Sequence, residues 1–474
     1  MKYKVKENWL GDVRYSRVQS RVVALAFLCA MLDGLDLQII AYVVPTIAEA
    51  LSLSVEHVGL IFSAGFIGLA AGSMFIAPLG DRWGRKIVII LSLMLFGGSM
   101  LITPFARSVE GLVVLRLLTG CGIGGIMPNV IAITIEYAPK AHRSAMSTFV
   151  YMGFIIGAAI GGFVASLIMQ RFGWEGVFFL GGTLPLALAV VLIWILPESL
   201  AYLLQQKDAA RRIKRIGDRF QIDVTTIIER PQNGRSPGGV GIKALFASGY
   251  LKNTILVWIA MFSALLSLFP LVQWLPSLLH KAQMPLADAN FLVGAMWLAA
   301  IIGAVIYTYG SRYVLLNKIL SIYLLLAFFF TACAGVVAQE DVLSVWPFVI
   351  GIGITGAACQ VGFYSVLSNI YPASIRVTGI GMAQGIGRTA AIVGPAIVAR
   401  LLDMEVPLVY VYFWLAVPFL FSAMAMCYVG GPRRSNGMGV AVPKEPLNEA
   451  ASVYDSLIEA GGESRRSRRP PNIE

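Results

Sequence analysis

The sequence predicts an all-α protein that crosses a membrane many times. Hydrophobic residues make up 57% of the 474 residues and charged residues only 13%, whereas globular chains average about 25% charged residues. This composition leaves too little charge to cover a soluble surface, so a soluble enzyme, a disordered scaffold and a coiled coil are excluded. A transmembrane β-barrel would show alternating strands of about ten residues, and the sequence has no such pattern.

Twelve transmembrane helices are expected. A helix that crosses a bilayer needs about 20 predominantly apolar residues. Two stretches of this kind, 22–48 and 377–399, carry internal charges. Ten further windows of at least 19 residues contain no Asp, Glu, Lys or Arg, and they are 57–80, 87–106, 117–135, 144–170, 176–197, 253–280, 289–311, 319–339, 342–375 and 406–432.

The spans divide into two six-helix pseudo-repeats. Pro139 with Arg143 is echoed by Pro372 with Arg376, at an offset of 233 residues for both pairs. Parallel repeats of this kind occur in transporters whose halves rock around a site near the midplane. The expected divisions are an N-terminal segment at 1–21, a first bundle at 22–197, a linker at 198–252, a second bundle at 253–430 and a disordered tail at 431–474.

Basic residues are concentrated on one side of the expected bundle. Of the 37 Lys and Arg residues, 31 lie on the side of the N-terminus, three on the other side and three within spans. The positive-inside rule therefore predicts that both termini, the linker and the tail are cytoplasmic. Because topology and anionic lipid explain the net charge of +11, the bilayer is the expected partner and nucleic acid is not.

Metal and dinucleotide sites are not expected. The five cysteines fall in predicted spans without a Cys-x-x-Cys pair, and the three histidines lie at or beyond helix ends. Two G-x-G-x-x-G patterns, at 120–125 and 351–356, lie inside apolar helices, where a dinucleotide motif would need a preceding strand. Close helix packing through small residues explains them better, as it does for Gly153, Gly157 and Gly161.

The turn after the second span carries the most specific motif, Gly80-Asp81-Arg82-Trp83-Gly84-Arg85-Lys86. An acid among alternating bases can pair with neighbouring helix ends and release them when the helices move, although a plain positive-inside turn would also be basic. The segment resembles the signature loop of the major facilitator superfamily, G-x-x-x-D-R-x-G-R-K, with Ala77 at its opening glycine. The resemblance implies a major facilitator fold and a gating role for Asp81, Arg82, Gly84, Arg85 and Lys86, while Glu136 and Arg376 are expected to stabilise or gate the inner helix ends.

Within that superfamily, residues from about 20 to 430 resemble the aromatic acid:proton symporters. The first span contains D-G-x-D as Asp33-Gly34-Leu35-Asp36, and the eleventh contains G-x-G-R as Gly385-Ile386-Gly387-Arg388. The stretch 153–162 lacks the proline expected in the fifth span of exporters. The resemblance implies a proton-coupled importer of a benzoate-like or hydroxybenzoate-like acid in a bacterial-type inner membrane, with no cofactor beyond the proton gradient and no enzymatic activity.

Two acids in the first span are the candidate proton-coupling residues. At 1.5 Å per residue from Val22, Asp33 and Asp36 lie about 17 and 21 Å along the helix. Their spacing of three places both on one face, which we expect to face the central cavity. An ionisable group in a membrane interior costs about 2.5–3.5 kcal/mol, and two neighbouring carboxylates there do not both ionise easily. The structural alternative is a pair locked to Arg116 for assembly.

Two arginines and a set of aromatic residues are the candidates for substrate binding. Arg116 could neutralise Asp36. Arg388 has no acid four residues away on its own helix, so a bound anion is its natural partner, and its guanidinium can hold a carboxylate in a forked geometry. The aromatic candidates, each of which could instead contact lipid or another helix, are Tyr151, Trp274, Trp297, Phe363 and Tyr364.

The expected function is secondary transport of an aromatic carboxylate with a proton, by alternating access and as a monomer. One alternative is transport of another organic anion, or its export by proton antiport. A different class of alternative is a membrane sensor without transport activity, whose linker or basic tail binds a partner.

Overall fold

The computed structural model describes residues 17–138, 143–199, 202–203, 245–246, 250–311, 313–340, 342–371 and 373–430. Eleven helices in these ranges are long and apolar enough to cross a membrane, so the chain is a multi-pass membrane protein. This confirms the predicted all-α class. Most of the predicted N-terminal segment and linker, and the whole predicted tail from 431, lie outside the described residues.

The first half contains five of these long segments. The helix η1 is a π-helical turn that joins α2 to α3, so the second predicted span is one continuous segment, Val55–Trp83. The elements of this half are α1 (Arg17–Ala50), α2 (Val55–Ala71), η1 (Gly72–Ile76), α3 (Leu79–Trp83), α4 (Arg85–Ile102), η2 (Thr103–Phe105), α5 (Val109–Tyr137) and α6 (Arg143–Ile195).

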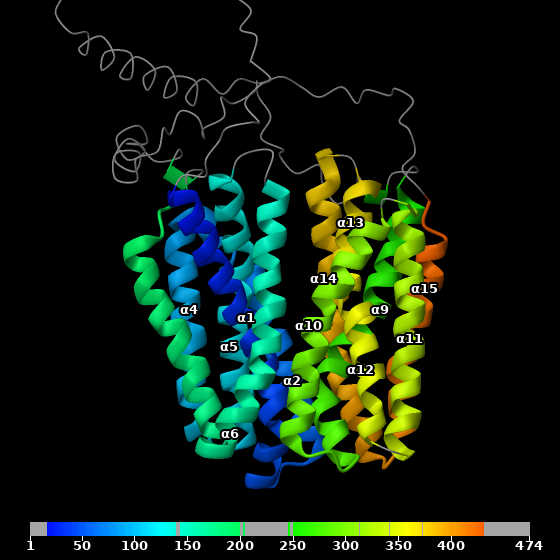
Figure 1. Cartoon of the computed structure of the whole chain (residues 1–474). Helices are drawn as coiled ribbons and strands as arrows, with labels where there is room; N and C mark the ends of the chain where they lie inside the picture. Colours follow the sequence, from blue (N-terminus) through cyan, green and yellow to red (C-terminus); the bar gives the residue numbers. More distant parts are fainter. Residues whose placement is uncertain are drawn as a thin grey trace, which may run out of the picture.

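Helix α6 holds two predicted spans. It has 53 residues, and Gly173, with φ 66° and ψ −173°, departs from helical geometry within it. A straight helix of this length would extend about 80 Å, far more than a bilayer of about 30 Å. The positive φ, which glycine adopts without strain, lets the chain fold back into the two arms seen in Figure 1. Counting those arms separately, the described helices account for the twelve predicted spans.

The second half repeats this architecture. Another π-helical turn, η7, interrupts the tenth span between α12 and α13. The elements are α9 (Leu251–Lys281), α10 (Leu286–Gly310), α11 (Leu316–Glu340), η6 (Val342–Val345), α12 (Trp346–Ile352), η7 (Gly353–Ala357), α13 (Cys359–Ile370), α14 (Ala373–Asp403) and α15 (Leu408–Cys427).

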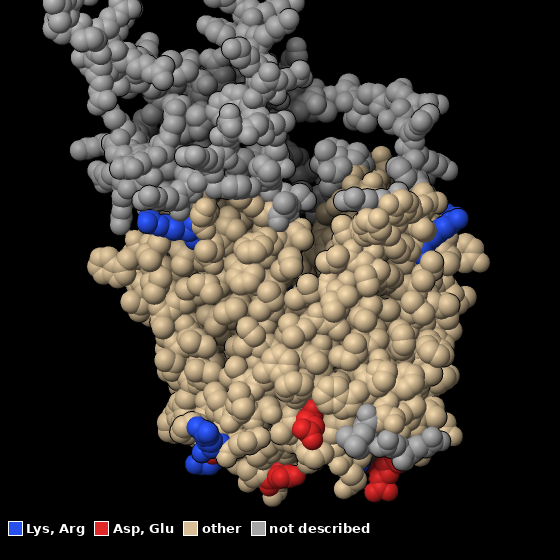
Figure 2. All heavy atoms as spheres, in the orientation of Figure 1, with Lys and Arg blue, Asp and Glu red and all other residues tan. Residues whose placement is uncertain are grey.

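The two halves stand side by side, with α1–α6 in one bundle and α9–α15 in the other (Figure 1). Helices α2, α6 and α1 of the first half pack on α14, α10 and α9 of the second. We call the end of the bundle where the described chain begins and ends the terminal face, and the other end the opposite face. Figure 2 shows that the charged side chains visible on this side gather towards the two ends, which leaves an uncharged band for the lipid.

Polar contacts join the halves near the opposite face. Arg400 of α14 donates to Glu56 of α2 over 3.1 Å. Deeper in the bundle, the Ser63 hydroxyl donates to the carbonyl oxygen of Ile392 at 2.8 Å, and the Asn290 amide donates to that of Tyr42 at 3.2 Å. These contacts hold the opposite ends of the two halves together.

Helices α1 and α6 approach each other through glycines. A Cβ atom on Gly157 would overlap the carbonyl oxygen of Met31, and one on Gly34 would overlap the backbone of Phe154. Both helices therefore present bare backbone to each other, as small residues allow in membrane helix pairs. This packing fixes the turn that carries Asp33 against the part of α6 that carries Phe154.

We expect Gly157→Ala to lower the free energy of unfolding by about 1–3 kcal/mol, because the added methyl group meets backbone that only a helix shift can move. Gly98→Ala in α4 is the matched control, since a Cβ atom there meets open space and alanine favours the helix. Thermal unfolding of the purified proteins in detergent measures both. Equal melting temperatures for the two variants would contradict the close-packing argument.

Candidate functional site

A cavity of about 260 Å³ lies between the two halves. Helices α1, α2, α5 and α6 supply one wall, and α9, α10, α13 and α14 supply the other. Both π-helical turns contribute to it, through Ser73 of η1 and Ala357 of η7, and such turns are frequent at functional sites. The cavity therefore has the position expected for a transport site, because both halves meet around it.

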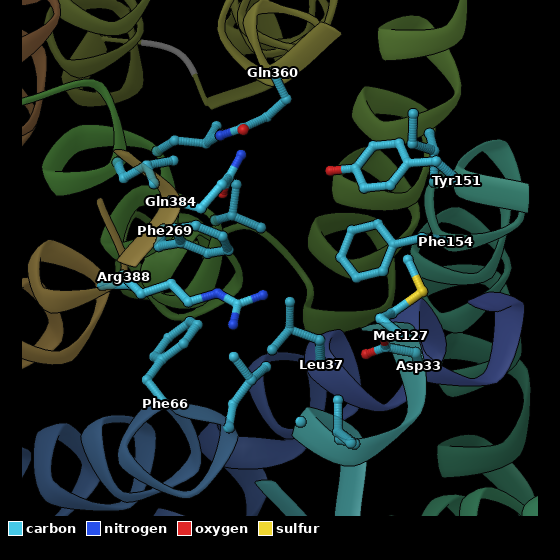
Figure 3. Close-up of a pocket in the computed structure, with 18 of the residues that line it drawn as sticks. Asp33, Leu37, Phe66, Met127, Tyr151, Phe154, Phe269, Gln360, Gln384 and Arg388 are labelled. Carbon is cyan, nitrogen blue, oxygen red and sulfur yellow. The ribbon is translucent and has the colours of Figure 1, made fainter. Parts of the chain in front are cut away.

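Arg388 brings a positive charge into this cavity from α14 (Figure 3). One guanidinium nitrogen donates to the Ser73 hydroxyl of the other half at 2.8 Å. Within the described part of the chain, no carboxylate forms an ion pair with Arg388. The guanidinium thus keeps donors available for an anion that enters the cavity.

Asp33 lies on the wall that faces Arg388 (Figure 3). Its side chain comes from α1, and the residue is only 4% exposed. Among the described residues it has no ion-pair partner. The carboxyl group of Asp33 and the guanidinium group of Arg388 therefore line the same cavity from different halves without forming an ion pair.

Asp36 differs from the expectation that both acids face the central cavity. It forms an ion pair with Arg116 of α5, with Nη2 and Oδ2 3.2 Å apart, and both residues are buried. Three residues advance an α-helix by about 300°, so the two acids point about 60° apart. That rotation directs Asp36 towards α5, where a separate cavity of about 20 Å³ touches both Asp36 and Arg116.

Arg116 therefore does not take the predicted place of a substrate-binding residue in the central cavity. Its guanidinium is held by Asp36, and it lines the smaller cavity instead. The pairing of Arg116 with Asp36 that the sequence suggested is present. It removes one acid and one base from the charges that can act on a substrate.

Three of the five predicted aromatic residues line the cavity. These three are Tyr151, Tyr364 and Trp297, and Phe154 lies between Tyr151 and Trp297. Tyr151 stacks on Phe154 with ring centroids 5.7 Å apart and meets Tyr364 edge-on at 6.2 Å, while Phe154 meets Trp297 edge-on at 6.1 Å. These rings form one continuous aromatic surface across the two halves.

Trp274 and Phe363 depart from the prediction and are not among the lining residues. The Trp274 indole donates to the carbonyl oxygen of Pro395 at 3.2 Å and meets Phe62 edge-on. Phe363 is fully buried in the apolar core. Each side chain packs against other protein residues rather than lining the cavity. The prediction failed because residue type alone does not show which way a helix face points.

Sequence reasoning missed three glutamines of the cavity, Gln38, Gln360 and Gln384. The amide nitrogen of each is buried and has no hydrogen-bond partner in the described residues. The sequence did offer a signal, because each glutamine is a neutral polar residue within an otherwise apolar span. Burying an unpaired amide costs free energy, so such a residue is a candidate for ligand binding. The prediction considered only ionisable and aromatic residues.

The predicted gate residue Arg85 lies in a cluster of polar side chains at the terminal face. It forms an ion pair with Glu136 of α5 and another with Asp81, whose carboxylate oxygen is 3.5 Å away. The Ser199 hydroxyl donates to the other oxygen of Glu136 at 2.8 Å. The cluster ties together the ends of α3, α4 and α5 and the chain after α6, all in the first half.

Glu198 belongs to the same cluster and was not predicted as a gate residue. It accepts the backbone N–H of Lys86 at 3.0 Å and that of Ser199 at 2.8 Å. Gly84 lies against this carboxylate with φ 99°, where a Cβ atom would collide with it. The signal in the sequence was an acid directly after the sixth span, at Pro197-Glu198-Ser199.

The remaining gate candidates are placed differently. Arg82 is exposed, and the Lys86 ammonium group donates to the carbonyl oxygen of Ile193 at 2.7 Å. The backbone of Arg376 lies in α14, but its side chain is outside the described part of the structure. The cluster around Arg85 is therefore built from Asp81, Gly84, Glu136, Glu198 and Ser199.

Comparisons with known proteins agree with this architecture. The sequence model of the Major Facilitator Superfamily matches residues 26–395. The 4-hydroxybenzoate transporter PcaK of Pseudomonas aeruginosa is 32% identical over 88% of this chain and 93% of its own. The gallate transporter of Pseudomonas putida is 29% identical over 92% and 97%, and the benzoate transport protein of Acinetobacter baylyi is 26% identical over 94% and 96%.

A solved structure shares the fold. A bacterial homologue of the human lysosomal transporter Spinster, in an inward-facing and occupied conformation, superimposes with a TM-score of 0.62 over 98% of this chain and 100% of its own. Its sequence identity is 16%, so this likeness concerns the fold alone. From the match of the superfamily model and the relatives that span almost the whole length, the chain belongs to the Major Facilitator Superfamily, whose members are transporters and not enzymes.

Proposed function

We propose that the chain imports an aromatic carboxylate together with a proton, by alternating access across a bacterial inner membrane. The observation that carries this proposal is the Arg388 guanidinium, which reaches a cavity between the halves without a carboxylate partner among the described residues. Relatives named for the transport of 4-hydroxybenzoate, gallate and benzoate support the class of substrate. All three compounds carry a carboxylate on an aromatic ring.

The geometry of the cavity suits a substrate with one ring. Its volume of about 260 Å³ is slightly below the range of about 300–1,000 Å³ for drug-sized ligands. Arg388 supplies two parallel donors for a carboxylate. The rings of Tyr151, Phe154 and Trp297 then offer faces and edges against which an aromatic ring can pack.

The charge of the cavity supports proton coupling. With Asp33 ionised and no substrate bound, the charges of Asp33 and Arg388 balance, and the Asp36–Arg116 pair is neutral by itself. A substrate carboxylate would add one negative charge, which a low-dielectric site disfavours. A proton on Asp33 restores neutrality, so the favoured loaded state contains one anion and one proton. Both the empty and the fully loaded carrier are then neutral and can change conformation.

The direction of transport rests on the sequence. The excess of basic residues on the N-terminal side supports a cytoplasmic position for the terminal face. The absence of a proline from 153–162 argues against an exporter. Because the halves are in contact near the opposite face, this structure represents a state in which the outer side of the carrier is closed.

We expect Arg388→Ala to weaken the binding of a ring acid by about 2–5 kcal/mol, because the buried charge partner of its carboxylate is lost. Arg388→Lys should bind with intermediate affinity, since an ammonium group attracts the anion without the forked geometry. Isothermal titration of benzoate and of benzamide measures the effect, and wild type should prefer the acid. Arg171→Ala, at an exposed arginine far from the cavity, is the control. Equal affinity of wild type for acid and amide would rule out the carboxylate assignment.

For Asp33→Asn, we expect uptake that equilibrates the substrate but no longer concentrates it, because the proton-binding group is gone. Substrate binding by wild type should weaken as the pH rises, since the loaded state takes up a proton, and the variant should lose this dependence. Proteoliposome uptake with and without an inward proton gradient measures accumulation. Accumulation against the gradient by Asp33→Asn would place the coupling group elsewhere.

The second acid supplies the comparison for that experiment. Asp36→Asn would leave the buried Arg116 without its partner, which typically costs about 3–5 kcal/mol of stability. This variant should therefore lose thermal stability rather than coupling alone, and the two acids can be told apart by unfolding measurements.

We expect Asp81→Asn to slow transport several-fold while changing substrate affinity less than about twofold. The Asp81 carboxylate is 74% exposed beside Arg85, and an exposed pair contributes only about 0–1 kcal/mol to a static structure, so its effect should appear in the conformational step. Initial uptake rates and equilibrium binding separate the two quantities. Asp288→Asn, at an exposed acid of α10, should change neither, and normal uptake by Asp81→Asn would remove the gating role.

A further inference from the structure

Two glutamine amides from the second half lie at one end of the central cavity. Gln360 comes from α13 and Gln384 from α14, and both line the cavity. Figure 3 shows the two side chains near each other, with Tyr151 on the facing wall and its hydroxyl directed into the cavity. This end of the cavity is therefore polar, although apolar helices surround it.

Both amides have unused donors. Their Nε2 atoms are buried, and within the described part of the chain neither has a hydrogen-bond partner. A buried donor left unpaired costs about 1–3 kcal/mol, and because both amides line one cavity, one ligand there can satisfy both. The cavity that they line is where that contact would be made, so a ligand atom that accepts hydrogen bonds is the expected partner.

The amides are placed along the same helix as the carboxylate-binding arginine. Gln384 precedes Arg388 by four residues, so the two lie on one face of α14 and about 6 Å apart along its axis. This rise is similar to the length of a benzene ring with one substituent at each end. A ring that holds its carboxylate at Arg388 and extends towards the terminal face would bring its far end to Gln360 and Gln384.

We infer that Gln360 and Gln384 determine substrate specificity by binding an oxygen on the ring carbon opposite the carboxylate. The inference rests on the proposed function, because it takes Arg388 as the carboxylate site. The amide N–H groups donate to a hydroxyl oxygen at this position, and the Tyr151 hydroxyl on the facing wall can accept the hydroxyl proton. An unsubstituted or methyl-substituted ring leaves the same donors unpaired, and such sites reject analogues that lack the polar group.

The test compares three ring acids on the full-length protein. Benzoate, 4-hydroxybenzoate and 4-methylbenzoate all carry the carboxylate, and the methyl group resembles the hydroxyl in size but cannot hydrogen-bond. We expect wild type to bind 4-hydroxybenzoate about tenfold more tightly than 4-methylbenzoate, measured by isothermal titration at neutral pH. Equal affinities in wild type would overturn the inference without any variant, and would leave the proposed function standing.

The variants Gln360→Met and Gln384→Met remove the amides but keep an unbranched side chain of similar length. In the double variant, the tenfold preference should fall to about one, mainly because 4-hydroxybenzoate binds more weakly. Gln170→Met is the control, since this exposed glutamine of α6 does not line the cavity. It should leave the ratio of the two affinities unchanged.

Each remaining outcome decides the question. An unchanged preference in the double variant, or an equal loss of preference in Gln170→Met, would overturn the assignment to Gln360 and Gln384. Failure of wild type to bind any of the three acids would overturn the proposed function itself, and this result is distinct from binding all three without preference.

Discussion

The charge of Arg388, which has no ion-pair partner among the described residues, is the constraint on which the central cavity depends. A cation within a membrane protein requires a counter-charge or water, and the chain treats its buried charges in two different ways. Arg116 is paired with Asp36 inside the first half. Arg388 instead shares a cavity with Asp33 of the other half and donates a hydrogen bond to the Ser73 hydroxyl. The first arrangement pairs both charges with each other, whereas in the second no described carboxylate occupies the guanidinium.

Helix packing determines where that cavity forms. Because α1 and α6 meet through Gly34 and Gly157, little space is left between them, and Asp33 is held beside the aromatic residues of α6. Helix α14, which carries Arg388, belongs to the other half. The cavity between the halves is lined by aromatic residues of both and by the glutamines. The same close packing that stabilises the first bundle thus leaves the binding volume at its boundary with the second.

Much of the fold could be predicted from the sequence, and less of the site. The apolar windows located the spans because the bilayer requires about 20 apolar residues per crossing, and the turn at Gly173 falls in the gap between the windows 144–170 and 176–197. The motif at 80–86 led to Arg85, but Glu198, which accepts the backbone N–H of Lys86, follows the sixth span and becomes a neighbour only through folding. Asp36, Trp274 and Phe363 were assigned to the wrong surroundings, because helix periodicity gives the angle between residues on one helix and not the rotation of that helix against its neighbours. The glutamines required the structure, since nothing in the sequence distinguishes a cavity amide from one bonded to a neighbouring helix.

The contacts within a half differ in character from those between the halves, and this difference suits alternating access. The side chains of Arg85 and Glu136, which tie helix ends inside the first half, are 16% and 15% exposed. Arg400 and Glu56, which join the halves at the opposite face, are 63% and 56% exposed. Exposed ion pairs contribute only about 0–1 kcal/mol, whereas partly desolvated pairs with added hydrogen bonds resist separation more strongly. The first half can therefore move as one body. Of its contacts with the second half, the exposed ion pair opens at little cost, whereas the deeper hydrogen bonds from Ser63 and Asn290 oppose the opening. The cavity wall that carries Asp33 would then keep its shape while its access changes from one face to the other.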